Sequence, residues 1–141
     1  MVLSVVVLAL AGCQPLAVSV LGAAGGAALR YSFDGVTSRT FTASAPAVKE
    51  ASLAALERMG ITHDGTAPYE YGEIISARTE NRTIEIELEP ISPKATRVRV
   101  AAKNGGMLYD NATASEIVAQ TERVLSSAAS AGSGPTGASS F

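Results

Sequence analysis

Three segments of alternating polar and apolar residues, at 73–80, 83–89 and 95–102, limit most strongly what this chain can fold into. Alternation with a period of two places the apolar side chains of a strand on one face of a sheet. The connections, Asn81-Arg82 and residues 90–94, are short enough for antiparallel hairpins. The sequence therefore predicts a three-strand antiparallel meander with one apolar face.

The two connections also predict which residues pair. A two-residue turn at Asn81-Arg82 places Glu80 opposite Thr83, and the second loop places Glu89 opposite Ala95. Both registers keep the apolar residues in phase on one face. The predicted apolar pairs are Ile75–Leu88, Ala77–Ile86 and Thr79–Ile84 across the first turn, and Ile86–Val98 and Ile84–Val100 across the second.

The same registers predict matched charges on the opposite face. Glu85 is expected between Arg78 and Arg99, and Glu87 is expected beside Arg97. A row of carboxylates between guanidinium groups can serve an active site. Matched charges on a solvated sheet face need no such role, so we interpret this face as ordinary polar surface.

Two amphipathic helices are predicted to cover the apolar face. The first spans 44–59, with Pro46 in its first turn and Gly60 just past its end. The second begins with a capping box at Thr113 to Glu116 and runs to about Ser127. Their apolar positions are Val48, Ala51, Ala55, Leu56 and Met59 in the first helix, and Ile117, Val118, Thr121, Val124 and Leu125 in the second.

The remaining elements complete an α+β fold. A strand at 36–42 follows a turn at Asp34-Gly35, with residues 31–33 as its hairpin partner, and 61–63 is expected to be a short edge strand before a loop at 64–68. The predicted fold is an antiparallel sheet of three to four strands with two amphipathic helices packed on one face.

The N-terminal segment predicts export. Residues 2–11 are apolar over the length of a signal-peptide core, which is too short to span a bilayer. They end in Leu10-Ala11-Gly12-Cys13, which resembles the bacterial lipobox and contains the only cysteine of the chain. The resemblance implies signal cleavage between Gly12 and Cys13 and lipid attachment at Cys13, and Gln14 favours retention at the outer over the inner membrane. The alternative is an uncleaved span over 2–29.

This segment divides the chain into four parts. They are a signal peptide at 1–12, the lipidated Cys13 with a Gly/Ala-rich tether at 13–29, an α+β domain at 30–127, and a disordered tail at 128–141.

The whole pattern resembles a family of small bacterial lipoproteins classed as a domain of unknown function. The residues that carry the resemblance are Cys13, the stretch from Gly22 to Ala28, Tyr31 and Gly35, and the helix from Pro46 to Gly60, followed by the meander at 73–102. The resemblance implies a β-α-β-β-β-α domain and brings no catalytic residues with it.

Composition limits the function classes. With 11 basic and 13 acidic residues the chain lacks the positive charge of a nucleic-acid-binding protein. His63 is the only histidine and Cys13 the only cysteine, so neither a Cys/His catalytic pair nor a zinc ligand set is expected. We expect no enzyme activity, no cofactor and no metal site.

The sequence thus favours a non-catalytic lipoprotein of the bacterial envelope, held on the periplasmic face of the outer membrane by its lipid anchor. Its expected role is structural, in assembly or in binding another envelope protein. The alternative is a periplasmic module that binds a small ligand or lipid beneath the helices.

Overall fold

The computed structural model describes residues 30–31, 35–105 and 108–133. Its strands form one antiparallel sheet in the order β1-β2-β6-β5-β4-β3, with β7 also paired to β6. This confirms the α+β class, with more strands in the sheet than predicted. The elements are β1 (Arg30–Tyr31), β2 (Val36–Phe41), α1 (Ala45–Arg58), β3 (Thr62–Tyr69), β4 (Gly72–Arg78), β5 (Arg82–Ser92), β6 (Ala95–Asn104), β7 (Leu108–Tyr109) and α2 (Asn111–Gly132).

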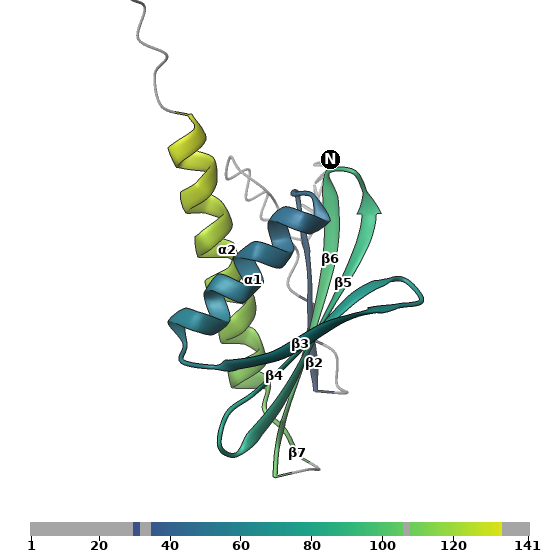
Figure 1. The fold of residues 1–141 in the computed structure, drawn as a ribbon, viewed down its shortest axis with the longest axis vertical. Helices are drawn as coiled ribbons and strands as arrows, with labels where there is room; N and C mark the ends of the chain where they lie inside the picture. The colour runs from purple at the N-terminus through teal and green to yellow at the C-terminus, as the bar shows by residue number, and fades with distance from the viewer. Residues whose placement is uncertain (1–29, 32–34, 106–107, 134–141) are drawn as a thin grey trace, which may run out of the picture.

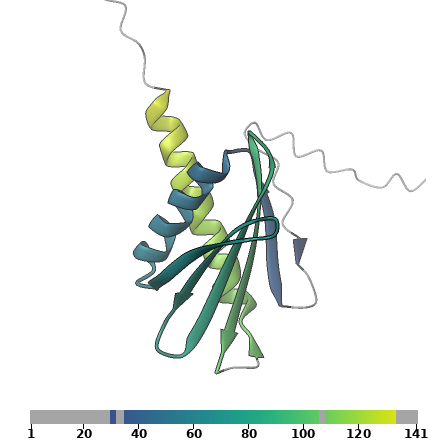
Figure 2. The same cartoon turned by 45° about the vertical axis from the view of Figure 1, so that its right-hand side comes forward.

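Both helices lie against the same face of the sheet and contact each other, which leaves the opposite face bare in the described part of the chain (Figures 1 and 2). Apolar side chains from the central strands and from the inner faces of both helices fill the layer between them. The helix residues predicted to face inward are buried or pack against the core, except Val124, which is half-buried and lies outside the core cluster. The largest fully buried apolar side chains are Leu56, Ile75, Ile84, Ile86, Leu88, Ile117, Val48, Val98, Val100 and Val118.

The meander forms as predicted, but the turn between β4 and β5 lies one residue earlier in the sequence than predicted. Thr79 lies opposite Arg82, its amide donating to the Arg82 carbonyl at 2.9 Å, so the two-residue turn is Glu80-Asn81. Ile75 consequently pairs with Ile86, and not with Leu88. Moving a two-residue turn by one position shifts each pair by two residues, which keeps every side chain on its predicted face.

The loop predicted at 90–94 is instead mostly strand. The predicted β5–β6 register is also wrong, because Ile86 pairs with Val100 and not with Val98. Pro90 lies opposite Thr96, and a register irregularity between Pro90 and Ser92 lets the strand continue. Proline has no amide hydrogen to donate to a neighbouring strand. Pro90 is tolerated because the pairing of β4 with β5 extends only as far as Leu88, so no β4 carbonyl needs a hydrogen bond from position 90.

The loop predicted at 64–68 is also wrong, because β3 is a single edge strand paired with β4 along its length. A bulge between His63 and Gly65 absorbs the irregular sequence, and Pro68 sits on a strand with a free outer edge. Glycine and proline suggest a loop in a sequence, but an edge strand accepts both.

Helix α1 has nearly the predicted bounds. Ser44 is its N-cap residue, although its side chain makes no capping hydrogen bond, and Gly60 follows the helix with φ +67°. That left-handed conformation favours glycine, as the sequence indicated.

Helix α2 begins earlier and ends later than predicted. The N-cap residue is Asp110, whose side chain accepts from the Thr113 amide, so the capping box predicted at Thr113 is wrong. The helix continues to Gly132, well past Ser127. The first residues of the predicted tail are therefore helical, and 134–141 lie outside the described residues.

The N-terminal hairpin is confirmed in part. Strand β1 pairs with β2, and Tyr31 lies opposite Thr37. A two-residue turn at Asp34-Gly35 would place Tyr31 opposite Ser38, so the connection is not that turn; residues 32–34 lie outside the described part. Gly35 itself is buried, with φ +74°.

Candidate functional site

The predicted lipid-attachment site lies outside the described residues. Cys13 and Gly12, together with the signal peptide, the tether and the alternative span over 2–29, all precede Arg30, where the described part begins. Within 30–31, 35–105 and 108–133, no helix is long and apolar enough to cross a membrane.

His63 lies on β3 with its side chain exposed, and its Nε2 is 3.2 Å from the Thr66 hydroxyl oxygen. Among the described residues no three His, Cys, Asp or Glu side chains are grouped so that they could hold a metal ion. Neither observation brings His63 into a reactive cluster.

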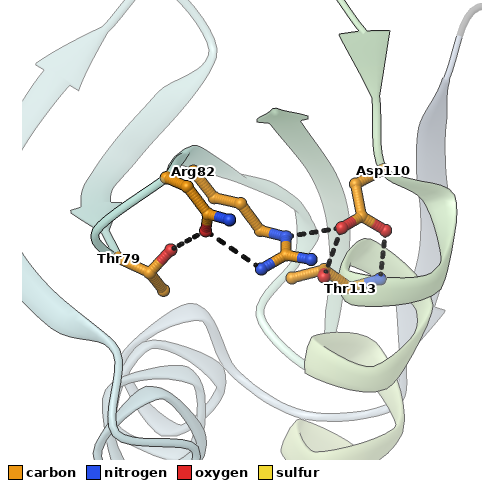
Figure 3. A network of polar contacts seen from close by, with 5 residues as sticks. Thr79, Arg82, Asp110 and Thr113 are labelled. Atoms are coloured by element: carbon orange, nitrogen blue, oxygen red, sulfur yellow. Dashed lines mark hydrogen bonds and ion pairs between the residues drawn. The ribbon is translucent and has the colours of Figure 1, made fainter. Parts of the chain in front are cut away.

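A polar network joins the β4–β5 turn to the start of α2 (Figure 3). Arg82 donates through Nε to Asp110 Oδ2 at 2.5 Å and through a terminal nitrogen to Asn81 Oδ1 at 3.2 Å. The Thr113 amide and hydroxyl donate to the two Asp110 carboxylate oxygens at 3.0 and 2.8 Å. The network thus connects residues 28 positions apart in sequence.

These hydrogen bonds stabilise the ionised carboxylate of Asp110. The Thr113 backbone amide, then the Thr113 hydroxyl and the Arg82 guanidinium, lower the pKa of Asp110 from 3.8 to about 2. Every donor in the network has a structural task, either capping α2 or fixing the turn. We therefore assign this cluster to stability.

The bare face of the sheet carries pairs of glutamate and arginine, the kind of charge pair that the sequence predicted. Arg99 contacts Glu87 at 3.3 Å and Arg97 contacts Glu89 at 3.1 Å. The individual partners differ from the prediction because of the shifted registers. Glu85 lies between Ser76 and Ala101, not between Arg78 and Arg99, and Glu87 lies between Ile74 and Arg99.

Two tyrosines lie at the end of this face where β3 turns into β4. Tyr69 pairs with Gly72, and since Ile75 and Ala77 of β4 point into the core, Gly72 and its partner belong to the bare face. The Tyr69 and Tyr71 rings lie edge to face, with centroids 6.1 Å apart and planes at 80°. Tyr71 is 61% exposed, which is high for an aromatic side chain.

The surroundings of Tyr69 disfavour ionisation of its hydroxyl. Burial of its ring, then the charges of Glu87 and Glu89, raise the pKa of Tyr69 above its usual value, and Arg99 lowers it by less. The Tyr69 hydroxyl oxygen is buried and makes no hydrogen bond to a described residue. The loop predicted at 64–68 conceals this pair in the sequence, because the two rings meet only across the β3–β4 turn. The signal was present in Tyr69-Glu70-Tyr71-Gly72, where a β-forming tyrosine and a glycine flank the two-residue turn Glu70-Tyr71.

Another ion pair lies on the helix-covered side. Arg39 of β2 makes a two-pronged contact with Glu122 of α2, one of its bonds measuring 2.6 Å. The Arg39 side chain is only 10% exposed, and its guanidinium lies 5.4 Å from the Phe41 ring centroid. This pair attaches the sheet edge to α2.

The fold and these surfaces define a class: a small α+β protein with one helix-covered sheet face and one bare, charged sheet face. The chain belongs to the family described as Protein of unknown function (DUF3568), which it matches over residues 1–123. No curated protein matches it.

Proposed function

We propose that the protein is a non-catalytic, membrane-anchored lipoprotein of the bacterial envelope whose domain binds another envelope protein. The observation that carries the proposal is Leu10-Ala11-Gly12-Cys13 at the end of an apolar run. A thiol at this position can take a thioether-linked lipid, and buried acyl chains hold a protein on a membrane at about 0.8 kcal/mol per methylene. The Gln14 that follows favours the outer membrane.

The family match supports the proposal because it begins at residue 1 and so includes the apolar run and Cys13 together with the domain. The bare sheet face supports a binding role. It offers exposed tyrosine and arginine side chains, the residue types enriched at protein interfaces.

The alternative, a module that binds a small ligand beneath the helices, has less support. The side chains that face each other there, such as Ile86, Val100 and Ile117, have no exposed surface. One hollow beside α1, lined by Leu53, Leu56, Glu57, Ile61 and His63, opens at the surface.

The intact mass of the protein recovered from the membrane fraction tests the anchor, with a Cys13→Ala variant as control. We expect a chain that begins at Cys13 and carries added acyl mass, and a Cys13→Ala chain without it. An unmodified full-length chain in the wild type would contradict the proposal and favour the span over 2–29.

In-cell cross-linking tests the binding role. We expect a reproducible contact between the domain and another envelope protein, which is lost when the bare sheet face is altered. Cross-links only to the protein itself would count against a partner.

A further inference from the structure

The large apolar side chains that are exposed in the described residues lie at two opposite ends of the sheet. Tyr71 in the β3–β4 turn is 61% exposed, and Ile91 beside the β5–β6 turn is 47% exposed. Leu108 and Tyr109 of β7 are 74% and 47% exposed. Tyrosine and aliphatic side chains suit the boundary between water and the acyl chains of a bilayer. By composition, either end fits a membrane surface.

The strand registers define these two ends. A Cβ atom on Gly72 would lie 3.0 Å from Cδ of Pro90, so the β3–β4 turn lies beside the part of β5 that leads into the β5–β6 turn. Strand β7 pairs with the end of β6, Leu108 lying opposite Asn104, and so lies at the other end of the sheet (Figures 1 and 2). The end with the β3–β4 and β5–β6 turns is named the Tyr71 end, and the end with β7 the Leu108 end.

The direction of β1 distinguishes the two ends. Arg30 lies opposite Ser38 and Tyr31 opposite Thr37. Where β2 pairs with β6, Ser38 is nearer to the β5–β6 turn than Thr37 is. Followed from Tyr31 back to Arg30, the backbone therefore heads towards the Tyr71 end. The chain enters the sheet from that end.

We infer that the Tyr71 end of the sheet lies on the surface of the phospholipid bilayer that holds the anchor, with Tyr71 and Ile91 among the headgroups. This inference rests on the proposed lipid anchor at Cys13 and names the surface of the domain that the membrane covers. Residues 14–29, which join Cys13 to Arg30, span at most about 55 Å in any conformation. So short a connection keeps the domain concentrated beside the membrane, and a weak contact then suffices.

The charges at the Tyr71 end do not oppose this contact. Glu70 in the β3–β4 turn and Lys94 in the β5–β6 turn are both exposed and of opposite sign. Their charges balance, so the contact depends on the apolar side chains. The strands lead away from this end, which leaves the bare sheet face open to the proposed protein partner.

Tryptophan is a suitable reporter for the test because the chain contains none. Tyr71→Trp, Ile91→Trp and the matched control Leu108→Trp are recovered from the membrane fraction and reconstituted into vesicles of phosphatidylethanolamine and phosphatidylglycerol. Some of the acyl chains carry bromine, which quenches tryptophan fluorescence on contact. We expect Tyr71→Trp and Ile91→Trp to be quenched at least about twofold more strongly than Leu108→Trp. All three positions are exposed, so the substitutions leave the core intact.

A second substitution tests whether the two turns touch the bilayer together. Ile91→Asp, added to the Tyr71→Trp protein, places a charge at the contact and should reduce the quenching by about half. Leu108→Asp, added to the same protein, is the matched control and should leave the quenching unchanged.

Equal quenching of Tyr71→Trp and Leu108→Trp would overturn the inference, as would quenching that Ile91→Asp does not reduce. Unquenched reporters together with cross-links from Tyr71 or Ile91 to another protein would also overturn it and assign this end to the protein partner. The intact mass of the same samples reports the anchor separately. An acylated protein with equal quenching at both ends contradicts this inference alone, whereas a protein absent from the membrane fraction contradicts the anchor as well.

Discussion

At the scale of single residues, Asp110 shows how one carboxylate can determine where a helix begins. Its two carboxylate oxygens accept hydrogen bonds from the amide and the hydroxyl of Thr113, and Arg82 also donates to the carboxylate. The sequence contains the necessary spacing, Asp110 followed three positions later by Thr113. The Thr113–Glu116 pair matched the capping box equally well, and only the contact with Arg82 at the start of β5 decides between them.

This carboxylate should make stability depend on pH. The pKa of Asp110 is lowered from 3.8 to about 2 in the folded protein, so its contribution is complete above pH 3.8 and disappears as the pH falls through 2. We expect Asp110→Asn, which keeps a capping oxygen but removes the charge, to lower the free energy of unfolding by about 1 kcal/mol at pH 7, allowing for solvent screening.

Urea unfolding of both proteins between pH 7 and pH 2 checks this expectation. The difference in unfolding free energy should close at the acid end. A difference that is the same at all pH values would mean that the hydrogen-bond geometry, and not the charge, supplies the stability.

Gly35 is a second residue whose identity is fixed by its surroundings. Its φ is +74°, and a Cβ atom there would lie 2.2 Å from Cβ and 2.1 Å from Cγ of Tyr109. We expect Gly35→Ala to cost more than 2 kcal/mol, because backbone strain of about 1 kcal/mol adds to overlap with atoms near the root of the ring.

Gly60→Ala is the matched control for Gly35→Ala, because Gly60 has φ +67° but nothing within 4 Å of the added atom. It should cost about 1 kcal/mol, the strain alone. Thermal unfolding of the two variants measures the difference. Equal losses would show that Tyr109 moves aside freely.

At the scale of elements, the sequence predicted faces better than registers. Alternation determines which side chains point into the core, and the buried Ile75, Ile86 and Val100 are on their predicted side. The partner across each turn depends on which two residues form the turn. Neither Glu80-Asn81 nor Asn81-Arg82 contains the glycine that would have decided this.

Strand β3 was predicted only at its start, as the edge strand at 61–63, and the rest of it was missed for a related reason. Gly65 and Pro68 are loop residues in most contexts, and only the free outer edge of the sheet makes them acceptable in a strand. The edge-to-face pair of Tyr69 and Tyr71 was missed with it, because the two rings come together only once β3 is recognised as a strand. The Cys13 site is a local motif and needs no such knowledge of the sheet.

The two kinds of ion pair should differ in their effect on stability. Arg39 is 10% exposed and its Nε has no hydrogen-bond partner among the described residues, so Glu122→Gln leaves a nearly buried charge without compensation and should cost about 1 to 2 kcal/mol. Glu89→Gln on the bare face should change the unfolding free energy by less than about 0.5 kcal/mol.

A double-mutant cycle with Arg39→Met in urea unfolding isolates the coupling of Arg39 with Glu122. We expect the double variant to recover part of the loss caused by Glu122→Gln, because it no longer contains the buried charge. Strict additivity of the two substitutions would contradict this account of the pair.

At the scale of the whole molecule, elements from the beginning and the end of the domain pack against each other. Strand β2 pairs with β6, and α2 covers both of them on the inner face. The contribution of α2 to the core ends at Leu125, which is half-buried against it. From Ser126 to Ser133 every residue is exposed, and the family match ends at Arg123.

The last turns of α2 should therefore add little to stability. They run past α1 (Figures 1 and 2), and their Ser and Ala side chains bury no apolar surface in the domain. We expect removal of residues 127–141 to shift the thermal midpoint by no more than about 2 °C. Removal of residues 117–141, which takes away Ile117, Val118 and Thr121, should abolish cooperative unfolding. A large loss of stability from the shorter truncation would show that the exposed turns of α2 contact a surface outside the described domain. The partner would then have to be sought on this side of the molecule as well as on the bare sheet face.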